Sequence, residues 1–146
     1  MWRILLIEDA HVVREPLSRL LQSEGFDVAS AADGNEAMAV LEAREAREGP
    51  VDLVLLDVLM PRMDGVAFLE VLRRDARHRH LPVIALTGIS DTTKLTRLRT
   101  LGVSAILYKV RFSFDELVEE IRRNLATDGA PLCTDSTEKL ATDERR

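Results

Sequence analysis

The chain has 146 residues, the size of one domain of roughly 100–200 residues, and 46% of them are hydrophobic, so a single buried core is expected. Its 20 Lys and Arg residues and 25 Asp and Glu residues leave a net charge of −5, which disfavours binding to DNA or RNA through neutralised phosphates. The sequence has no signal-peptide pattern and no apolar run near the ~18 residues that span a bilayer. Its only cysteine, Cys133, cannot form an internal disulfide. These features are typical of a cytoplasmic protein outside the membrane.

Five short apolar runs alternate with longer amphipathic stretches, and this alternation is typical of consecutive βα units. The first run, residues 4–7, is continuous, as expected for a strand that is buried on both faces of a parallel sheet. It ends at the acidic pair Glu8-Asp9. The sequence therefore predicts an α/β fold that begins with a buried strand.

The first predicted helix has one apolar face and ends at Gly25. Pro16 lies early enough in it to be tolerated near the first turn. The apolar positions of this helix are Val13, Leu17, Leu20 and Leu21. The second unit is a weaker strand, residues 26–31, followed by a helix that Asp33 caps and that ends before Gly49-Pro50.

The third strand, residues 51–56, is the strongest strand signal and ends at Asp57. Residues 58–64 form a loop, and Gly65 opens a helix with apolar residues along one face. After this helix comes a basic stretch, which we interpret as a solvated face and a linker, with a docking surface for an acidic partner as the alternative. Its basic residues are Arg73, Arg74, Arg77, His78, Arg79 and His80.

The last two units follow the same plan. Residues 82–86 form a strand that ends at Thr87-Gly88, and Ser90 or Asp91 caps the helix after it. This helix buries Leu95, Leu98 and Leu101.

Residues 105–108 form the fifth strand, which ends at Lys109, and a capping box, Ser113-x-x-Glu116, opens the last helix. Apolar periodicity then disappears. We therefore divide the chain into one domain, residues 1–126, and a flexible C-terminal tail, residues 127–146.

Right-handed crossovers restrict five βα units to a doubly wound parallel sheet with helices on both faces. The strand orders common among such folds include 2-1-3-4-5, in which strands one and three are neighbours and ligands bind beyond their carboxyl ends. In that order Asp9 and Asp57 converge. Thr87 and Lys109 follow the neighbouring strands at the same edge.

These residue types suit phosphate chemistry. Carboxylates held together repel one another unless a cation compensates. Oxygen ligands without His or Cys select a hard ion, and a few carboxylates completed by water favour Mg²⁺ over Ca²⁺. With the ammonium of Lys109 and the hydroxyl of Thr87, such a site forms a cradle for a phosphoryl group in transfer.

Over residues 3–125 the chain resembles the receiver domain of bacterial two-component response regulators. The resemblance rests on Glu8-Asp9, on residues 57–65 (DVLMPRMDG), on Thr87-Gly88 and on Tyr108-Lys109, in the order and spacing of that family. It implies a flavodoxin-like (βα)5 sheet of order 2-1-3-4-5. It also implies a phosphoprotein of a phosphorelay.

The resemblance implies a role for each residue of the acidic site. Asp57 would accept a phosphoryl group from a phosphohistidine on a histidine kinase or a histidine phosphotransfer protein. Asp9, Asp57 and the backbone carbonyl of Leu59 would bind Mg²⁺, and Glu8 would act through a bound water. The chain would thus be a phosphoacceptor that promotes its own phosphorylation and dephosphorylation rather than a conventional enzyme.

The resemblance also implies a switch. Thr87 and Lys109 would contact phosphoryl oxygens, and Tyr108 would be the aromatic residue that turns inward when Thr87 moves. Phosphorylation would then change the surface of the fourth helix, fifth strand and fifth helix for partner binding. We expect a separate output protein because the tail is too short to fold. The sequence leaves open whether a homodimer forms and whether the chain is a piece of a longer protein.

Two departures from the family pattern lie beside the predicted site. Val110 stands where the family most often has proline after the lysine. Leu59 and Ile89 are apolar, whereas many rapidly hydrolysing relatives have amides or acids at one of these positions. We therefore hypothesise that the aspartyl phosphate is long-lived.

Two other classes of function fit parts of the pattern. A receiver-shaped interaction module that works without phosphate would be expected to lose at least one of its site residues, yet all are present: Glu8, Asp9, Asp57 and Lys109. A magnesium-dependent phosphatase or nucleotide enzyme would be expected to carry Asp-x-Asp, Gly-x-Gly-x-x-Gly or Gly-Lys-Ser/Thr, and the sequence has none of these motifs.

Overall fold

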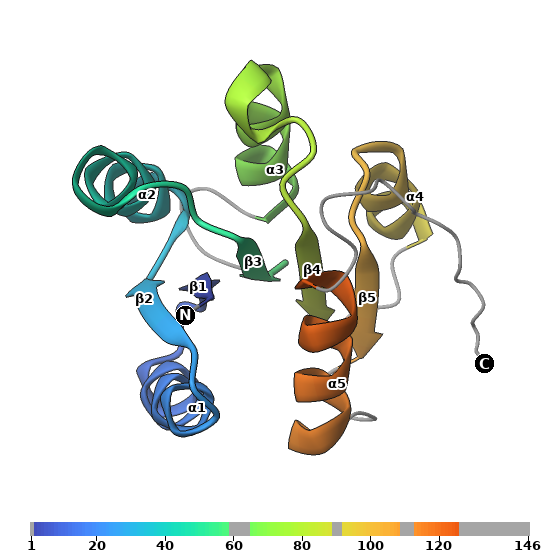
Figure 1. Cartoon of the computed structure of the whole chain (residues 1–146). Helices are drawn as coiled ribbons and strands as arrows, with labels where there is room; N and C mark the ends of the chain where they lie inside the picture. Colours follow the sequence, from blue (N-terminus) through green and yellow to red (C-terminus); the bar gives the residue numbers. More distant parts are fainter. Residues whose placement is uncertain (1, 59–64, 89–91, 109–112, 126–146) are drawn as a thin grey trace.

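The computed structural model describes residues 2–58, 65–88, 92–108 and 113–125. One parallel sheet runs through the molecule in the order β2-β1-β3-β4-β5 (Figure 1). Its strands are β1 (Arg3–Ile7), β2 (Asp27–Ala31), β3 (Leu53–Asp57), β4 (Val83–Thr87) and β5 (Ala105–Tyr108). The predicted strand order and the five predicted strands are confirmed, with ends that differ by one or two residues.

Helices cover both faces of the sheet (Figure 1). On one face lie α1 (His11–Ser23) and α5 (Phe114–Leu125). On the other lie α2 (Gly34–Glu48), α3 (Gly65–Arg74) and α4 (Thr92–Thr100). A short 3₁₀ helix, η1 (Ala76–His78), which the sequence did not predict, precedes β4.

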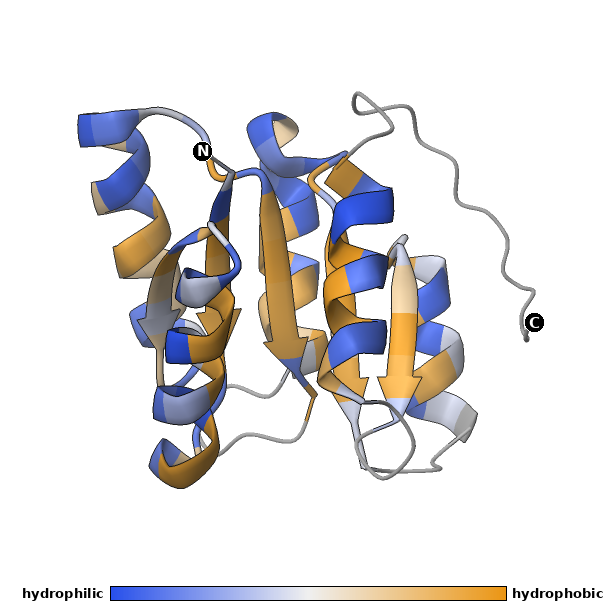
Figure 2. Ribbon diagram, turned by 60° about the horizontal axis from the view of Figure 1, so that its bottom comes forward, coloured by the Kyte–Doolittle hydropathy of each residue, from blue (hydrophilic) through white to orange (hydrophobic). Residues whose placement is uncertain are grey.

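Each face of the sheet has its own hydrophobic core, because successive side chains of a strand point to opposite faces. In β3, Val54 and Leu56 pack with α2, α3 and α4, whereas Leu53 and Leu55 pack with α1 and α5. All four are fully buried. Figure 2 shows the result, with hydrophobic strands between helices that are hydrophobic on one side and hydrophilic on the other.

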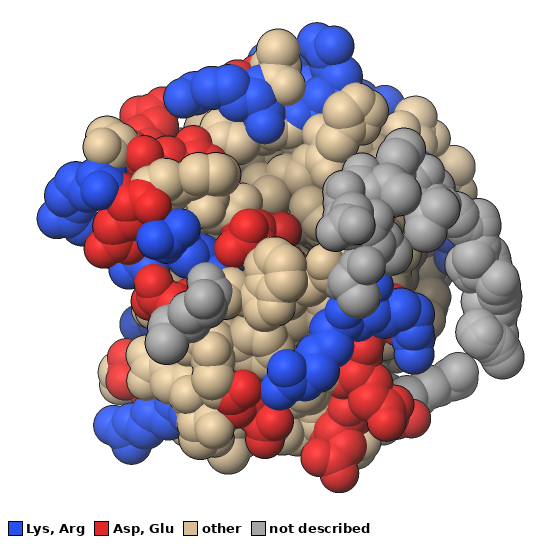
Figure 3. Space-filling view, viewed as in Figure 1, with Lys and Arg blue, Asp and Glu red and all other residues tan. Residues whose placement is uncertain are grey.

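The outer faces of the helices carry charges of both signs. On the face shown in Figure 3, acidic and basic side chains are interleaved over α2 and α5. No helix in the described part of the chain is long and apolar enough to cross a membrane.

The predicted helix caps that fall within the described residues are confirmed. Asp33 accepts a hydrogen bond from the backbone N–H of Glu36 at 2.9 Å. In the capping box, the N–H of Ser113 donates to Glu116 Oε1 at 2.7 Å, and the N–H of Glu116 donates to Ser113 Oγ at 3.2 Å. Gly49 follows α2 with φ +100°, which favours glycine. The predicted caps Ser90 and Asp91 and the predicted tail lie outside the described residues.

The structure corrects two predictions about α1. Because the helix begins at His11, Pro16 lies in the second turn rather than near the first. The predicted apolar face is also too wide, since Val13 is 42% exposed and Leu20 46% exposed. Leu21 is buried and Leu20 is not, because consecutive residues lie about 100° apart around a helix and only a narrow stripe of α1 faces the sheet.

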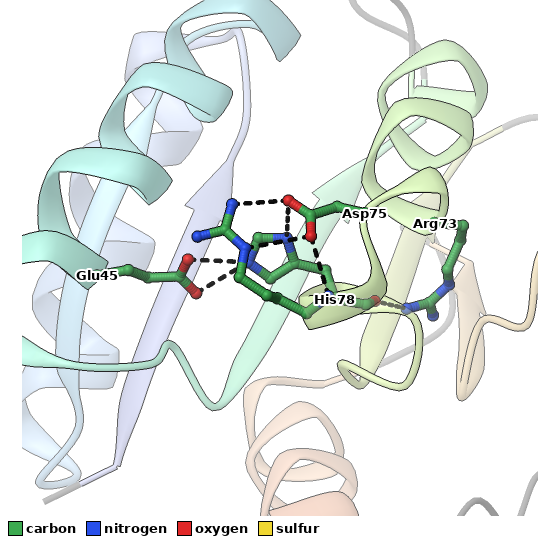
Figure 4. Close-up of polar contacts among 5 residues, drawn as sticks. Glu45, Arg73, Asp75 and His78 are labelled. Atoms are coloured by element: carbon green, nitrogen blue, oxygen red, sulfur yellow. Dashed lines mark hydrogen bonds and ion pairs between the residues drawn. The ribbon is translucent and has the colours of Figure 1, made fainter.

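The basic stretch is not solvated throughout, which corrects the prediction for two of its residues. His78 is 2% exposed, and its Nε2 lies 2.8 and 3.0 Å from the two carboxylate oxygens of Glu45 in α2 (Figure 4). Arg73 is half-buried and bonds to backbone carbonyls. Arg73 lies in the last turn of α3 and His78 in η1. The other residues of the stretch are exposed as predicted: Arg74, Arg77, Arg79 and His80.

Candidate functional site

Three carboxylates meet beyond the carboxyl ends of β1 and β3. Oxygen atoms of Glu8, Asp9 and Asp57, one from each residue, all lie within 4.8 Å of one another. The strands β1 and β3 are neighbours with Ile7 opposite Leu56, so the residues that follow them reach the same edge of the sheet. The predicted convergence of Asp9 and Asp57 is confirmed.

This acidic cluster fits a hard divalent cation. Glu8 is 1% and Asp57 2% exposed, while Asp9 is exposed, so the cluster is buried on one side and open to solvent on the other. Buried carboxylates need a compensating charge. Oxygen ligands with an open side suit Mg²⁺, which is bound through few carboxylates and keeps several waters. In the described part of the chain, no other group of three or more His, Cys, Asp and Glu side chains meets in this way.

Helix α1 holds the backbone of the acidic pair in place. Arg14 Nη1 donates to the carbonyl oxygen of Glu8 at 2.9 Å and to that of Asp9 at 3.4 Å. The N–H of Ala10 donates to Glu8 Oε2 at 3.2 Å, and the N–H of Glu8 donates to the Ala31 carbonyl at 3.0 Å. Arg14 was not predicted from the sequence. The sequence feature that could have identified it is an arginine in the first turn of the helix that follows the acidic pair.

Gly65 lets the chain pass close behind Asp57. The N–H of Gly65 donates to the Val58 carbonyl at 2.8 Å, which joins the two ends of the loop between β3 and α3. A Cβ atom at position 65 would lie 2.7 Å from Val58 Cα and 2.9 Å from the Asp57 carbonyl oxygen. Only glycine therefore fits without a shift of the backbone that carries Asp57. The sequence predicted the helix start at Gly65 but not this contact.

Thr87 and Tyr108 lie at the same edge, on the face that α4 covers. Thr87 ends β4 and is fully buried, and it is the register partner of Tyr108, which ends β5 and is half-buried. Alternation along β4 places Thr87 on the same face as Val83 and Ala85, which pack with α2, α3 and α4. Tyr108 packs against that same cluster.

The sequence matches the response regulator receiver domain family over residues 4–122. The chain belongs to this family. Receiver domains are phosphoacceptor signalling modules of two-component systems, and the predicted family and fold are thereby confirmed.

Among curated proteins, this receiver domain is 32% identical to the chemotaxis protein CheV3 of Helicobacter pylori over 127 residues, which is 84% of this chain and 40% of CheV3. It is 39% identical to the probable transcriptional regulator ycf27 of Porphyridium aerugineum over 121 residues, 82% of this chain and 46% of that protein. The chain thus spans about half the length of the curated relatives it matches.

Solved structures resemble the receiver domain over nearly their whole length. The chemotaxis protein CheY4 of Vibrio cholerae has 31% identity and a TM-score of 0.73, with 84% of this chain and 98% of that chain covered. The receiver domain of a signal transduction histidine kinase from Syntrophus aciditrophicus has 28% identity and a TM-score of 0.76, with 93% and 99% covered.

Some predicted site residues of the receiver domain lie outside the described residues. These are Leu59, the predicted backbone ligand, and Lys109, the predicted partner of the phosphoryl group. The departures from the family pattern at Ile89 and Val110 lie there too. The roles assigned to these positions stay predictions.

Proposed function

We propose that the protein is a phosphoacceptor in which Asp57 takes a phosphoryl group from a phosphohistidine in a Mg²⁺-dependent reaction. The observation that carries this proposal is the meeting of Glu8, Asp9 and Asp57 oxygens within 4.8 Å, with Asp57 at the end of a buried strand. The donor would be a histidine kinase or a histidine phosphotransfer protein, and a separate output protein in the cytoplasm would read the result.

The transfer exchanges one bond to phosphorus for another. A carboxylate oxygen of Asp57 attacks the phosphorus atom and forms the P–O bond of an acyl phosphate. The P–N bond to the donor imidazole breaks, and the imidazole nitrogen takes a proton from solvent. Hydrolysis by the domain itself would follow the same geometry, with water attacking phosphorus and Asp57 leaving as a carboxylate.

The acidic cluster would hold the ion that this transfer needs. Asp9 and Asp57 would ligate it with the backbone carbonyl of Leu59, and Glu8 would hold one of its waters. Bound Mg²⁺ supplies neutralisation of the charge that develops on the phosphoryl oxygens. Arg14 contributes by fixing the backbone of Glu8 and Asp9 through its bonds of 2.9 and 3.4 Å to their carbonyl oxygens.

Two neighbouring side chains would contact the phosphoryl group on Asp57. The hydroxyl of Thr87 would donate to one phosphoryl oxygen, and Lys109 would pair with another. Because Thr87 and Tyr108 share the face beneath α4, a movement of Thr87 changes the packing there and alters the surface formed by α4, β5 and α5. Coupling of about 1–3 kcal/mol is typical of such switches.

Intact mass spectrometry tests the proposal. The purified protein is incubated with Mg²⁺ and acetyl phosphate, and we expect a gain of one phosphoryl group that EDTA prevents. The gain should disappear in Asp57→Asn and persist in Asp115→Asn, which changes an exposed aspartate of α5. An unchanged mass with acetyl phosphate and with phosphorylated histidine kinases would contradict the proposal and favour an interaction module that works without phosphate.

A further inference from the structure

Three segments of the chain meet at Arg73, in the last turn of α3. Arg73 donates from Nε to the Leu101 carbonyl at 2.8 Å and from Nη2 to the Gly102 carbonyl at 3.0 Å, in the turn that follows α4. Its Nη1 donates to the carbonyls of His78 and Leu81, at 2.8 and 2.9 Å, and Figure 4 shows the bond to His78. These bonds hold the end of α3, the segment after η1 and the end of α4 side by side.

Each of these three segments carries exposed basic side chains, which together we call the basic surface. They are Arg74 at the end of α3, Arg79 and His80 after η1, and Arg99 in the last turn of α4. Within the part of the chain that the structure describes, none of these four side chains makes an ion pair or a side-chain hydrogen bond. Their donors therefore point to solvent rather than to the protein.

Acidic side chains of the same elements do not neutralise the basic surface, because they have partners of their own. Asp75 Oδ2 lies 2.7 Å from Arg77 Nη2, and Glu70 Oε2 lies 3.0 Å from Arg97 Nη2. The helix α4 has three basic residues and no acidic one. Figure 3 shows basic side chains gathered over α3, whereas both signs are mixed over α2 and α5. A chain of net charge −5 thus has a locally basic surface.

Stabilisation of helix ends explains only half of this surface. Arg74 and Arg99 lie in the last turns of α3 and α4, where a positive charge interacts favourably with the helix dipole. Arg79 and His80 follow a helix of only three residues and lie in the connection to β4, so they have no such role. Exposed charges without partners in their own chain are suited to meet a partner of opposite charge.

The basic surface and the acidic cluster lie at opposite edges of the sheet. The segment after η1 leads into β4 and the turn after α4 leads into β5, whereas the acidic cluster lies beyond the carboxyl ends of β1 and β3. The five residues of β4 separate the two edges by about 15 Å. A partner on the basic surface would therefore leave the acidic cluster open to a phosphoryl donor.

The surroundings of the basic surface favour an acidic polypeptide over other polyanions. In the described part of the chain, the exposed large hydrophobic side chains are Trp2, Val12, Val13 and Leu20, and none of them belongs to the three basic segments. The surface thus lacks aromatic residues on which bases could stack and apolar residues that could insert into a membrane. The net charge of −5 also repels a long polyanion such as DNA, whereas a short acidic segment meets only the basic surface.

We propose that the basic surface is a docking site for an acidic segment of another protein. Arg74, Arg79 and Arg99 pair with Asp or Glu carboxylates of that segment through charge-assisted hydrogen bonds. Docking does not require a phosphoryl group on Asp57, so the partner stays attached while Asp57 gains and loses one. This inference goes beyond the proposed function and holds or fails independently of it.

Fluorescence anisotropy with a labelled oligoglutamate peptide tests the proposal on the unphosphorylated full chain in EDTA. We expect binding that weakens as NaCl is raised from about 50 to about 500 mM, because salt screens exposed charges. Arg74→Gln and Arg79→Gln should each weaken binding about threefold, and the double variant about tenfold. Asp57→Asn should bind the peptide like the wild type.

The matched control is Arg19→Gln. The side chain of Arg19 is 79% exposed, and it lies in α1 on the other face of the sheet. This variant changes the net charge as Arg79→Gln does, so a general effect of charge would weaken binding equally in both. Equal losses in the two variants, or no binding to the wild type at about 1 mM protein, would overturn the inference. Circular dichroism checks that the variants, all at exposed positions, are folded.

Other occupants are tested in the same buffer. A single-stranded oligothymidylate of the same charge and vesicles that contain phosphatidylserine should bind no more tightly than the peptide. Tighter binding of either probe that Arg79→Gln weakens would assign the basic surface to nucleic acid or to a membrane and overturn the choice of a protein segment. Self-association of the wild type that Arg79→Gln abolishes in analytical ultracentrifugation would assign it to a second copy of the chain and likewise overturn that choice.

Discussion

At Gly65, the lack of space for a Cβ atom constrains the backbone that carries Asp57. Replacing a helical glycine with alanine normally stabilises a helix by about 1 kcal/mol. For Gly65→Ala we expect the opposite, a loss of about 1–3 kcal/mol in the free energy of unfolding, because of overpacking. The added Cβ would lie 2.7 Å from Val58 Cα and 2.9 Å from the Asp57 carbonyl oxygen. Urea unfolding measures the loss, and phosphorylation by acetyl phosphate should slow several-fold.

Gly88→Ala is the matched control, because Gly88 also lies beside the site but a Cβ there would meet nothing within 4 Å. Its stability and phosphorylation rate should stay close to those of the wild type. A Gly65→Ala protein that is as stable as the Gly88→Ala protein would show that the loop between β3 and α3 adjusts freely.

Among individual residues, some of the site could be predicted from the sequence and some could not, for a physical reason. Asp57 and Thr87 each end an apolar run, so a local pattern marks them. Arg14 and Arg73 act through hydrogen bonds to backbone carbonyls, and Arg73 reaches residues 28 and 29 positions away. Every residue type has a backbone carbonyl, so the sequence does not show which residue accepts these hydrogen bonds.

At the scale of elements, α1 carries a proline in its second turn, where the missing N–H costs an intrahelical hydrogen bond. We expect Pro16→Ala to raise the free energy of unfolding by about 1–3 kcal/mol. Urea unfolding at pH 7 measures the change. Pro50→Ala, between α2 and β3, is the control and should give no gain, because that proline lies outside a helix. A Pro16→Ala protein without increased stability would show that α1 has already adapted to the proline.

An ion pair at the short helix η1 should make the stability of the fold depend on pH. Arg77 donates to Asp75 from Nε at 3.1 Å and from Nη2 at 2.7 Å, and these side-chain bonds, with the backbone N–H of Arg77, hold the pKa of Asp75 well below its ordinary value. Because the pKa is lower in the folded than in the unfolded protein, the interaction stabilises the fold above about pH 4 and this stabilisation is lost as the pH falls further. Asp75→Asn keeps the cap but not the charge. We therefore expect its stability to fall less steeply than that of the wild type below about pH 4.

Urea unfolding at a series of pH values between about 2 and 7 measures this difference in slope. Arg77→Gln removes the same interaction from the other side and should flatten the acid limb as well. Arg79→Gln, at an exposed position just after η1, is the control. Parallel curves for the wild type and Asp75→Asn would contradict the assigned ion pair.

At the element scale, the strands and most helix ends could be predicted because apolar runs, glycines and capping residues act locally. The width of the buried face of α1 could not, since it depends on how much of the sheet lies beneath the helix. η1 was missed because a three-residue turn has no periodicity. The burial of His78 likewise depends on Glu45, 33 residues away in α2.

At the scale of the whole molecule, the acidic cluster links metal binding to stability. Without a cation, three carboxylates within 4.8 Å repel one another in the folded state. We expect Asp9→Asn in EDTA to be more stable than the wild type by about 1–3 kcal/mol, as judged from Coulomb repulsion at partly screened sites. Saturating Mg²⁺ should stabilise the wild type and leave Asp9→Asn nearly unchanged.

Thermal or urea unfolding in EDTA and in Mg²⁺ provides the comparison. Asp52→Asn changes an aspartate at the opposite end of β3 and should respond to Mg²⁺ as the wild type does. If Mg²⁺ stabilises Asp9→Asn and the wild type equally, the cluster does not hold the ion.

Locating the phosphoryl group on the chain tests directly whether Asp57 is the phosphoacceptor. Sodium borohydride reduces an acyl phosphate to an alcohol, so a phosphorylated aspartate becomes homoserine. After phosphorylation with acetyl phosphate and Mg²⁺, borohydride reduction and peptide mass spectrometry, we expect homoserine at position 57. Homoserine at Asp9 instead, or a phosphoryl group that resists reduction on a serine or threonine, would contradict it.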